Sequence, residues 1–212
     1  MVEKFNTPQE EFWAGEFGSE YVGRNDSAHI LASNLSLFAK ALKHAGVFTS
    51  CLEFGANIGM NIKALQLLYP GIHLKAVEIN HDAAKQLTHL VGESNVFEGS
   101  IFEYPIASTV DLSLIKGVLI HINPDMLPTV YEKLYRASNR LILVCEYYNS
   151  TPTSIPYRGY SDRLFKRDFA GEILDKYPDL KLVDYGFSYH RDPAFPQGDI
   201  TWFLMEKHSE RN

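Results

Sequence analysis

Two kinds of hydrophobic run alternate along the chain after residue 27. In one kind the apolar residues recur every three or four positions, as in the segment 27–45, where they fall at Ile30, Leu31, Leu35, Phe38, Ala41 and Leu42. This spacing places them on one face of a helix, and Gly46 is a natural stop for it. The other kind is short and almost continuous, as in 140–146, which is typical of a parallel strand covered on both faces. The alternation indicates an α/β protein.

The order of these runs predicts the topology. The short runs predict strands at 49–54, 74–78 and 95–98, within 111–122 as far as Gly117, and at 140–146. Helical spacing with Pro and Gly at the ends predicts helices at 60–69, 81–90, 123–137 and 169–176. Two last strands, 180–189 and 200–207, are joined by a loop too short for a crossover helix, which favours an antiparallel pair. The prediction is an open, doubly wound, mostly parallel sheet with one antiparallel strand.

Two aromatic segments lie outside this pattern. The N-terminal segment, residues 1–26, carries Phe12, Trp13, Phe17 and Tyr21. It is equally interpretable as a lid that closes over a ligand, carrying Arg24 and Asn25, or as a helix stapled to the core by these rings. The segment 147–167 interleaves aromatic and cationic residues and is too long for a simple connector, so we expect either a substrate loop or a flap that contributes only packing.

Composition narrows the class of protein. A length of 212 residues fits one domain, and a net charge of −6 without any basic stripe disfavours a nucleic-acid partner. The N-terminus has no apolar signal core and no apolar run reaches the roughly eighteen residues of a membrane span, so we expect a cytoplasmic protein that does not contact membranes. Cys51 and Cys145 fall inside apolar runs and are expected to be buried, and the scattered His residues predict no metal site.

The stretch 52–59, L-E-F-G-A-N-I-G, carries the first chemical signal. It is a strand that ends in a glycine turn and feeds a helix, and glycine lets a ligand approach the backbone N–H groups closely. Twenty-three residues after Gly55, Glu78 closes the next strand, where a carboxylate can hold both hydroxyls of a ribose. The pair predicts a cofactor that contains a nucleoside.

The strongest alternative is a nicotinamide cofactor, because nicotinamide enzymes also combine a glycine turn with an acidic residue after the second strand. The turn G-A-N-I-G, however, lacks the middle glycine of G-x-G-x-x-G, which lets a pyrophosphate approach, and the chain has no separate substrate domain. Glu53, immediately before Phe54 and Gly55, points instead to a ligand with a cationic amino-acid tail.

These motifs carry a family resemblance. E-F-G-A-N-I-G resembles the E/D-x-G-x-G-x-G motif of class I S-adenosylmethionine-dependent methyltransferases, and A-V-E-I-N resembles their acidic ribose-binding motif. More narrowly, the chain resembles the pseudaminic acid biosynthesis-associated methylase family. That likeness lies in F-W-A-G-E-F-G-S-E-Y-V-G-R-N, K-G-V-L-I-H-I-N-P and I-P-Y-R-G-Y-S-D-R-L-F-K-R-D-F, and it spans nearly the whole chain.

The resemblance implies a seven-stranded sheet with S-adenosylmethionine at the carboxyl ends of the first, second and fourth strands. Gly55 would line the methionine moiety, Glu78 would hold the ribose, and Ser100 with Ile101 would flank the adenine. The expected cofactor-binding residues are Trp13, Tyr21, Arg24, Asn25, Glu53, Gly55, Ala56, Asn57, Gly59, Glu78, Ile79, Ser100, Ile101, Lys116 and Gly117. Asn57 replaces the usual middle glycine, and Ser100 stands where many class I enzymes have Asp.

Methyl transfer from a sulfonium is an in-line displacement in which the protein mainly supplies orientation. A hydroxyl or ammonium acceptor also needs a base. His121 is the first candidate because histidine titrates near neutral pH, and Glu146 is the second. A His121 that only caps a helix or packs in the core is the alternative.

The family resemblance implies a small acceptor, an acidic sugar of nonulosonic type, its precursor or a nucleotide-linked sugar. The residues expected to bind it are Tyr147, Tyr157, Arg158, Arg163 and His190. A nicotinamide oxidoreductase and a catalytically silent cofactor-binding module are the alternatives, and the sequence leaves the oligomeric state open.

Overall fold

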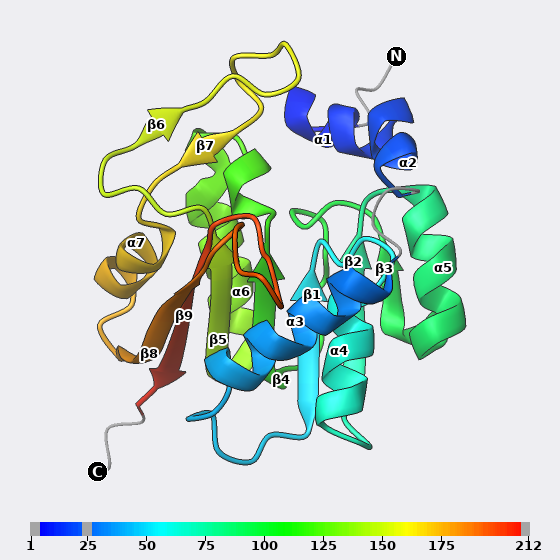
Figure 1. Ribbon diagram of the computed structural model, residues 1–212. Helices are drawn as coiled ribbons and strands as arrows, with labels where there is room; N and C mark the ends of the chain where they lie inside the picture. The colour runs from blue at the N-terminus through cyan, green and yellow to red at the C-terminus, as the bar shows by residue number, and fades with distance from the viewer. Residues whose placement is uncertain (1–4, 23–26, 209–212) are drawn as a thin grey trace.

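A computed structural model describes residues 5–22 and 27–208 of the chain, with a seven-stranded sheet at its centre (Figure 1). The sheet has the strand order β3-β2-β1-β4-β5-β9-β8. Its strands are β1 (Ser50–Phe54), β2 (His73–Glu78), β3 (Val96–Glu98), β4 (Val110–Lys116), β5 (Ser138–Glu146), β8 (Leu180–Ser188) and β9 (Ile200–Lys207). Strand β9 runs antiparallel to both β5 and β8, whereas the pairs among β1 to β5 are parallel. The predicted fold class is confirmed.

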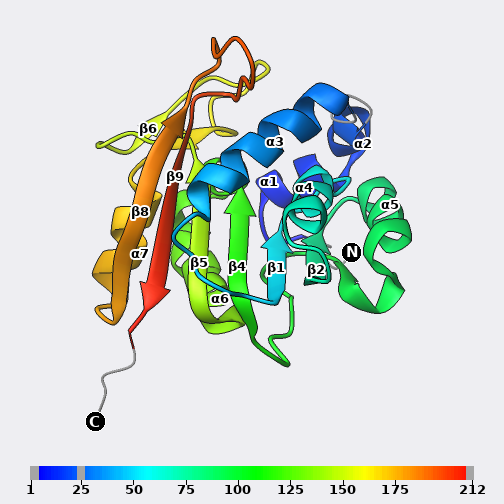
Figure 2. The same ribbon diagram turned by 60° about the horizontal axis from the view of Figure 1, so that its bottom comes forward.

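Helices cover both faces of the sheet (Figure 2). The helices α3 (Ala28–Ala41), α4 (Met60–Leu68) and α5 (His81–Val91) pack on one face, and α6 (Leu127–Ala137) and α7 (Phe169–Lys176) pack on the other. The strand β1 shows why both faces are covered, because Cys51 joins the core beneath α3 and α4 while Leu52 and Phe54 join the core beneath α6. A strand that is apolar on both faces needs such a double layer.

The topology brings three strand ends together. The chain runs outward from β1 through β2 to β3 and then returns to place β4 on the other side of β1. In doubly wound sheets ligands bind at the carboxyl ends of the strands next to such a reversal. Two short N-terminal helices, α1 (Pro8–Ala14) and α2 (Glu16–Val22), lie above these ends at the top of Figure 1.

The structure differs from the sequence prediction in several elements. The segment 147–167 contains two paired strands, β6 (Thr153–Ser154) and β7 (Phe165–Lys166). The helix predicted at 123–137 begins with a 3-10 turn, η3 (Pro124–Met126), and α3 ends at Ala41 rather than near residue 45. Strand β5 begins two residues before its predicted start, because Ser138 pairs with Val110 of the neighbouring strand β4. Two further 3-10 turns, η1 (Glu93–Asn95) and η2 (Leu119–His121), precede β3 and follow β4.

Both cysteines are buried and free. Within residues 5–22 and 27–208, no helix combines the length and the apolar content that a membrane crossing needs. The same residues contain no group of three or more His, Cys, Asp or Glu side chains arranged to hold a metal ion.

Candidate functional site

A cavity of about 560 Å³ lies at the carboxyl ends of β1, β2 and β4. The turns that follow these strands form its lower wall, and α3 with the loop 196–198 forms one side. Its upper wall comes from two segments that we call the roof, residues 8–22 (α1 and α2) and residues 153–166 (β6, β7 and the chain between them). A cavity of this volume suits a ligand the size of a nucleoside cofactor together with a small molecule.

The turn after β1 is built on three residues with a left-handed backbone, Gly55 (φ 73°), Asn57 (φ 47°) and Gly59 (φ 81°). At Gly55 a Cβ atom would stand 2.5 Å from Cγ2 of Val118, so no larger residue fits there. At the middle position asparagine adopts the left-handed region more readily than most other residues with a side chain. The departure from the glycine motif therefore preserves the conformation of the turn.

Glu78, at the end of β2, holds this turn in place. Its Oε2 accepts a hydrogen bond from the N–H of Asn57 at 2.7 Å, and its Oε1 accepts one from the N–H of Asn80 at 2.8 Å. Burial raises the pKa of Glu78, although these N–H groups oppose the rise. Because each carboxylate oxygen has two lone pairs, both oxygens keep the capacity to accept a ligand hydroxyl.

Ser100, in the turn after β3, lies against a carboxylate from the N-terminal helix. Its hydroxyl donates to Oε1 of Glu10 at 2.5 Å, and both side chains are buried. The hydroxyl of Thr7 donates to Oε2 of the same carboxylate at 3.2 Å. A carboxylate is therefore present beside Ser100, and it comes from α1.

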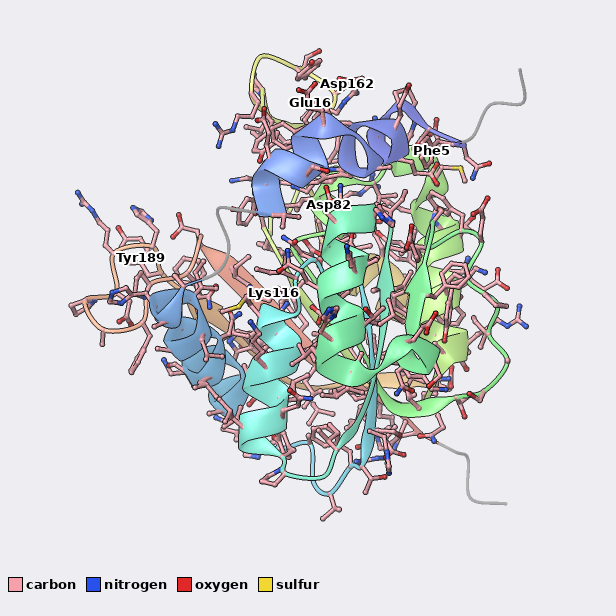
Figure 3. The ribbon with its side chains drawn as sticks, turned by 90° about the vertical axis from the view of Figure 1, so that its right-hand side faces the viewer. Phe5, Glu16, Asp82, Lys116, Asp162 and Tyr189 are labelled. Carbon is pink, nitrogen blue, oxygen red and sulfur yellow. The ribbon has the colours of Figure 1, made fainter. Side chains whose placement is uncertain are left out.

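A buried group of ionisable side chains lies beneath the cavity. Glu53 has no exposed surface, and burial raises its pKa to about 8, while the amide of Asn61 donates to its Oε1 at 2.5 Å. Lys116, at the end of β4, lies near the centre of the molecule (Figure 3) and lines the cavity. Burial lowers the pKa of Lys116, and its electrostatic interactions with Glu53 and Glu146 oppose this fall. Lys116 thus faces the ligand space and interacts electrostatically with two buried acidic side chains, Glu53 and Glu146.

Glu146, at the end of β5, binds the backbone of the turn after β4. Its Oε1 accepts hydrogen bonds from the N–H groups of Val118 and Leu119, both at 2.9 Å. Burial raises its pKa to about 7. Glu146 does not line the cavity, because this turn separates it from the ligand space.

His121 ends the turn η2 and lines the cavity. Its Nδ1 lies 2.6 Å from the backbone carbonyl oxygen of Arg163, and burial lowers its pKa to about 4. The imidazole is consequently neutral at physiological pH. The rings of Trp13 and Tyr157 pack against it, with centroid distances of 4.6 and 5.3 Å.

Several polar atoms of the lining have no hydrogen-bond partner within the described residues. They are Oε1 of Gln9, Nε1 of Trp13 and Oδ1 of Asn61, and all three are buried. A buried polar atom without a partner destabilises the fold. Unpartnered atoms of this kind are expected in a site where a bound polar ligand supplies the missing hydrogen-bond partners.

The structure brings most of the predicted site residues together. Those that line the cavity are Trp13, Tyr21, Gly55, Ala56, Asn57, Glu78, Ile79, Ser100, Ile101, Lys116, Gly117, His121, Tyr147 and Tyr157. Arg24 and Asn25 lie outside the described residues.

Six predicted residues do not line the cavity, namely Glu53, Gly59, Glu146, Arg158, Arg163 and His190. Glu53 and Glu146 lie beneath the turns, and Gly59 faces the side chains of α5. Arg158 is exposed to solvent, Arg163 stacks on rings of the roof, and His190 pairs with Asp199 in the loop between β8 and β9. The structure therefore places Arg158, Arg163 and His190, which were predicted to bind the substrate, outside the cavity.

Several parts of the lining were not predicted from the sequence. They include the start of α1, with Thr7, Gln9 and Glu10, the polar face of α3, with His29, Ser33 and Asn34, and the loop 196–198. A usable sequence signal existed for Asn34, a polar residue next to the apolar stripe of its helix, and the structure buries it almost fully. Its Oδ1 accepts a hydrogen bond from Gln197 in the loop between β8 and β9.

Known methyltransferase structures resemble this one. The mitomycin 7-O-methyltransferase MmcR has a TM-score of 0.67 and 16% identity over 95% of this chain, which spans 61% of MmcR. The 1,6-didemethyltoxoflavin-N1-methyltransferase of Burkholderia thailandensis, with bound 1,6-didemethyltoxoflavin and S-adenosylhomocysteine, has a TM-score of 0.67 and 19% identity, over 95% of this chain and 87% of that chain.

The magnesium protoporphyrin IX methyltransferase ChlM of Synechocystis PCC 6803, with bound S-adenosylmethionine, has a TM-score of 0.65 and 11% identity over 95% of this chain and 98% of that chain. No protein-family model and no curated protein sequence matches the chain. The likeness to the solved structures concerns the fold. The chain has the class I, Rossmann-like fold found in S-adenosylmethionine-dependent methyltransferases.

Proposed function

We propose that the protein is an S-adenosylmethionine-dependent methyltransferase that acts on a small polar acceptor. The observation that carries the proposal is the cavity at the carboxyl ends of β1, β2 and β4, with the Glu78 carboxylate and the left-handed turn at its lower wall. In the compared structures the same fold belongs to methyltransferases, two of which hold S-adenosylmethionine or S-adenosylhomocysteine.

The lining fits this cofactor. Glu78 would accept the ribose hydroxyls, Ser100 and Ile101 would contact the adenine, and Lys116 would pair with the methionine carboxylate. The unpartnered atom of Gln9 and that of Asn61 are both side-chain amide oxygens, which could accept hydrogen bonds from an amine of the ligand. When bound, the cofactor supplies a methyl group activated by the sulfonium.

The role of the protein is then to orient the acceptor and to take its proton. His121 is neutral and lines the cavity, so it can accept a proton from a hydroxyl or ammonium acceptor. The rings of Trp13, Tyr147 and Tyr157 offer flat faces to the acceptor and reduce the access of water. In this proposal the N-terminal segment is the lid and 147–167 is the substrate loop of one domain.

For the acceptor we favour an acidic sugar, its precursor or a nucleotide-linked sugar. Support comes from the family resemblance of the sequence and from the aromatic faces, which suit stacking on a sugar ring. Among the described lining residues, Lys116 is the ammonium group that a carboxylate of the acceptor or of the cofactor can meet.

Calorimetry with S-adenosylhomocysteine and with NAD tests the cofactor. We expect binding of S-adenosylhomocysteine and not of NAD, and we expect Glu78→Ala to weaken that binding about tenfold or more, since each hydrogen bond to a carboxylate contributes about 1.5–3 kcal/mol. Glu98→Ala, an exposed glutamate at the end of β3, is the matched control. Binding of NAD alone would make the protein a nicotinamide oxidoreductase.

Transfer of a methyl group to free acidic sugars and to CMP- and UDP-linked sugars, followed by mass spectrometry, tests the reaction. His121→Ala should lower turnover by about a hundredfold or more while leaving the affinity for S-adenosylhomocysteine unchanged. Equal losses of turnover and affinity, or no loss, would contradict the role of His121. Cofactor binding without transfer to any acceptor would favour a silent binding module.

A further inference from the structure

His121 takes its hydrogen-bond partner from the roof. Its Nδ1 lies 2.6 Å from the carbonyl oxygen of Arg163, and a carbonyl oxygen can only accept. Nδ1 therefore carries the hydrogen and Nε2 keeps its lone pair. The hydrogen bond of the ring within residues 5–22 and 27–208 is the one made by Nδ1, and His121 lines the cavity, so the lone pair of Nε2 is available to a ligand.

The side chain of Arg163 ties this carbonyl to the N-terminal helix. The guanidinium lies 5.7 Å from the ring centre of Phe12 in α1 and 5.2 Å from that of Tyr160, and only 12% of the side chain is exposed. Such stacking is a favourable cation–π arrangement. The guanidinium also forms an ion pair with Asp162 at 2.5 Å.

A second contact joins α1 to the same turn of chain. The amide of Gln9 donates to the carbonyl oxygen of Asp162 at 2.9 Å, one peptide before the carbonyl that His121 uses. In Figure 3 Asp162 lies above α1 and α2, where the two parts of the roof meet. On the other side, the carbonyl oxygen of Leu164 accepts from the N–H of Ile155 at 2.8 Å. The carbonyl groups on both sides of that of Arg163 are thus held by hydrogen bonds. The preceding one is held by α1, and the following one by the chain next to β6.

We infer that Arg163 is a positioning residue that, clasped by α1, fixes the tautomer of His121 with its backbone carbonyl. The inference rests on the proposed function only in taking His121 as the base. When Nε2 accepts the proton of the acceptor, the imidazolium keeps its Nδ1–H bond to this carbonyl, and that bond becomes charge-assisted and stronger. The base is in the correct tautomer only while the two parts of the roof are joined.

Few groups around His121 could form another hydrogen bond with its ring and so change its tautomer. Trp13 faces it from α1, and Tyr157 and Arg163 face it from the other part of the roof. Burial lowers its pKa and the bond to the carbonyl opposes this fall. The contact with Arg163 is therefore the polar interaction on which the position of the ring hydrogen depends.

Nitrogen NMR of the His121 imidazole in histidine-labelled protein tests the inference, with Arg163→Met as the variant. Methionine keeps an apolar stem of similar length and removes the guanidinium. We expect the Nδ1–H tautomer in the unmodified protein and a mixture of tautomers in Arg163→Met. Arg158→Met, an exposed arginine of the same segment, should give the spectrum of the unmodified protein.

Turnover supplies the second readout. Arg163→Met should lower turnover by about tenfold or more without changing the affinity for S-adenosylhomocysteine. Gln9→Leu, which removes the amide contact to Asp162, should shift the tautomer in the same direction, and it serves if Arg163→Met does not fold. An unchanged His121 spectrum in both variants would overturn the inference. Because the spectrum needs no cofactor and no acceptor, it is informative even if the protein transfers no methyl group.

Discussion

Asn57 combines a backbone role with a place in the lining of the cavity. Its φ of 47° is in the left-handed region, and its N–H donates to Glu78 at 2.7 Å. A glycine would supply the same conformation with more freedom in the unfolded chain, whereas asparagine adds a polar side chain to the lining. The turn motif therefore depends on a backbone conformation, which two residue types can supply.

This gives a prediction for two substitutions of Asn57. Asn57→Ala should lower the free energy of unfolding by about 1–2 kcal/mol, because a Cβ without a local hydrogen bond is disfavoured in the left-handed region. Asn57→Gly should change it by less than about 0.5 kcal/mol, since glycine adopts this φ without steric cost. Urea denaturation measures both, and equal losses in the two variants would contradict the backbone explanation.

At this scale the sequence predicts what is local. The glycine turn and Glu78 were recognisable because they directly follow predicted strands, and the register of a parallel sheet then brings strand ends together. Glu10 was not recognisable, because its contact with Ser100 crosses 90 residues and depends on how α1 docks. The positions of Arg158, Arg163 and His190 outside the cavity had no signal either, since aromatic and cationic residues suit a ligand and a packed roof equally well.

Among the elements, α1 depends most on contacts outside itself. A helix of seven residues is too short to be stable alone in water. Its anchors are the bond from Ser100 to Glu10, the bond from Gln9 to Asp162 and the amide of Asn80, which donates to the carbonyl oxygen of Trp13 at 3.3 Å. The first of these involves a buried carboxylate and is the strongest by type.

Glu10→Ala should therefore release α1. Loss of a hydrogen bond to a carboxylate removes about 1.5–3 kcal/mol, which corresponds to a rise of about tenfold or more in the open population. Limited proteolysis of the N-terminal segment should speed up by that factor. Glu11→Ala, at the exposed neighbouring position, should leave the rate unchanged. Equal rates for the two variants would show that Glu10 does not anchor the helix.

Elements with a double-sided apolar pattern were predicted well, and those held by long-range contacts were not. The five parallel strands and their helices follow from local periodicity. The strands β6 and β7 have two residues each, so they have no periodicity to detect. The N-terminal segment left two interpretations open for another reason. Its rings pack on one another, and some of them also line the cavity, so both the lid and the stapled helix match its aromatic pattern.

For the whole molecule, buried acids make stability depend on pH. Burial raises the pKa of Glu53 from 4.5 to about 8, so the folded state holds this proton more tightly than the unfolded chain does. The free energy of unfolding should fall as the pH rises from 4.5 to 8. His121 acts in the opposite sense, but its pKa is lowered from 6.5 to about 4, so its contribution is complete above pH 6.5.

The window from pH 6.5 to 8 therefore isolates the acids. The unmodified protein should lose about 1–2 kcal/mol there, and Glu53→Gln should lose markedly less, because the amide has no proton to release. Glu103→Gln, on the exposed surface, should follow the unmodified protein. The same loss in Glu53→Gln as in the unmodified protein would mean that Glu53 is ionised in the folded state.

The contact between Gln9 and Asp162 spans 153 residues of sequence. During synthesis α1 and α2 emerge from the ribosome before the strands of the sheet, yet the main-chain carbonyl that receives Gln9 is made only after β5. Contacts between residues so distant in sequence form late in folding, since the closure of a long loop must precede them. We therefore expect the sheet to assemble from neighbouring units and the cavity to close late in folding, when α1 docks on a segment that is made after β5.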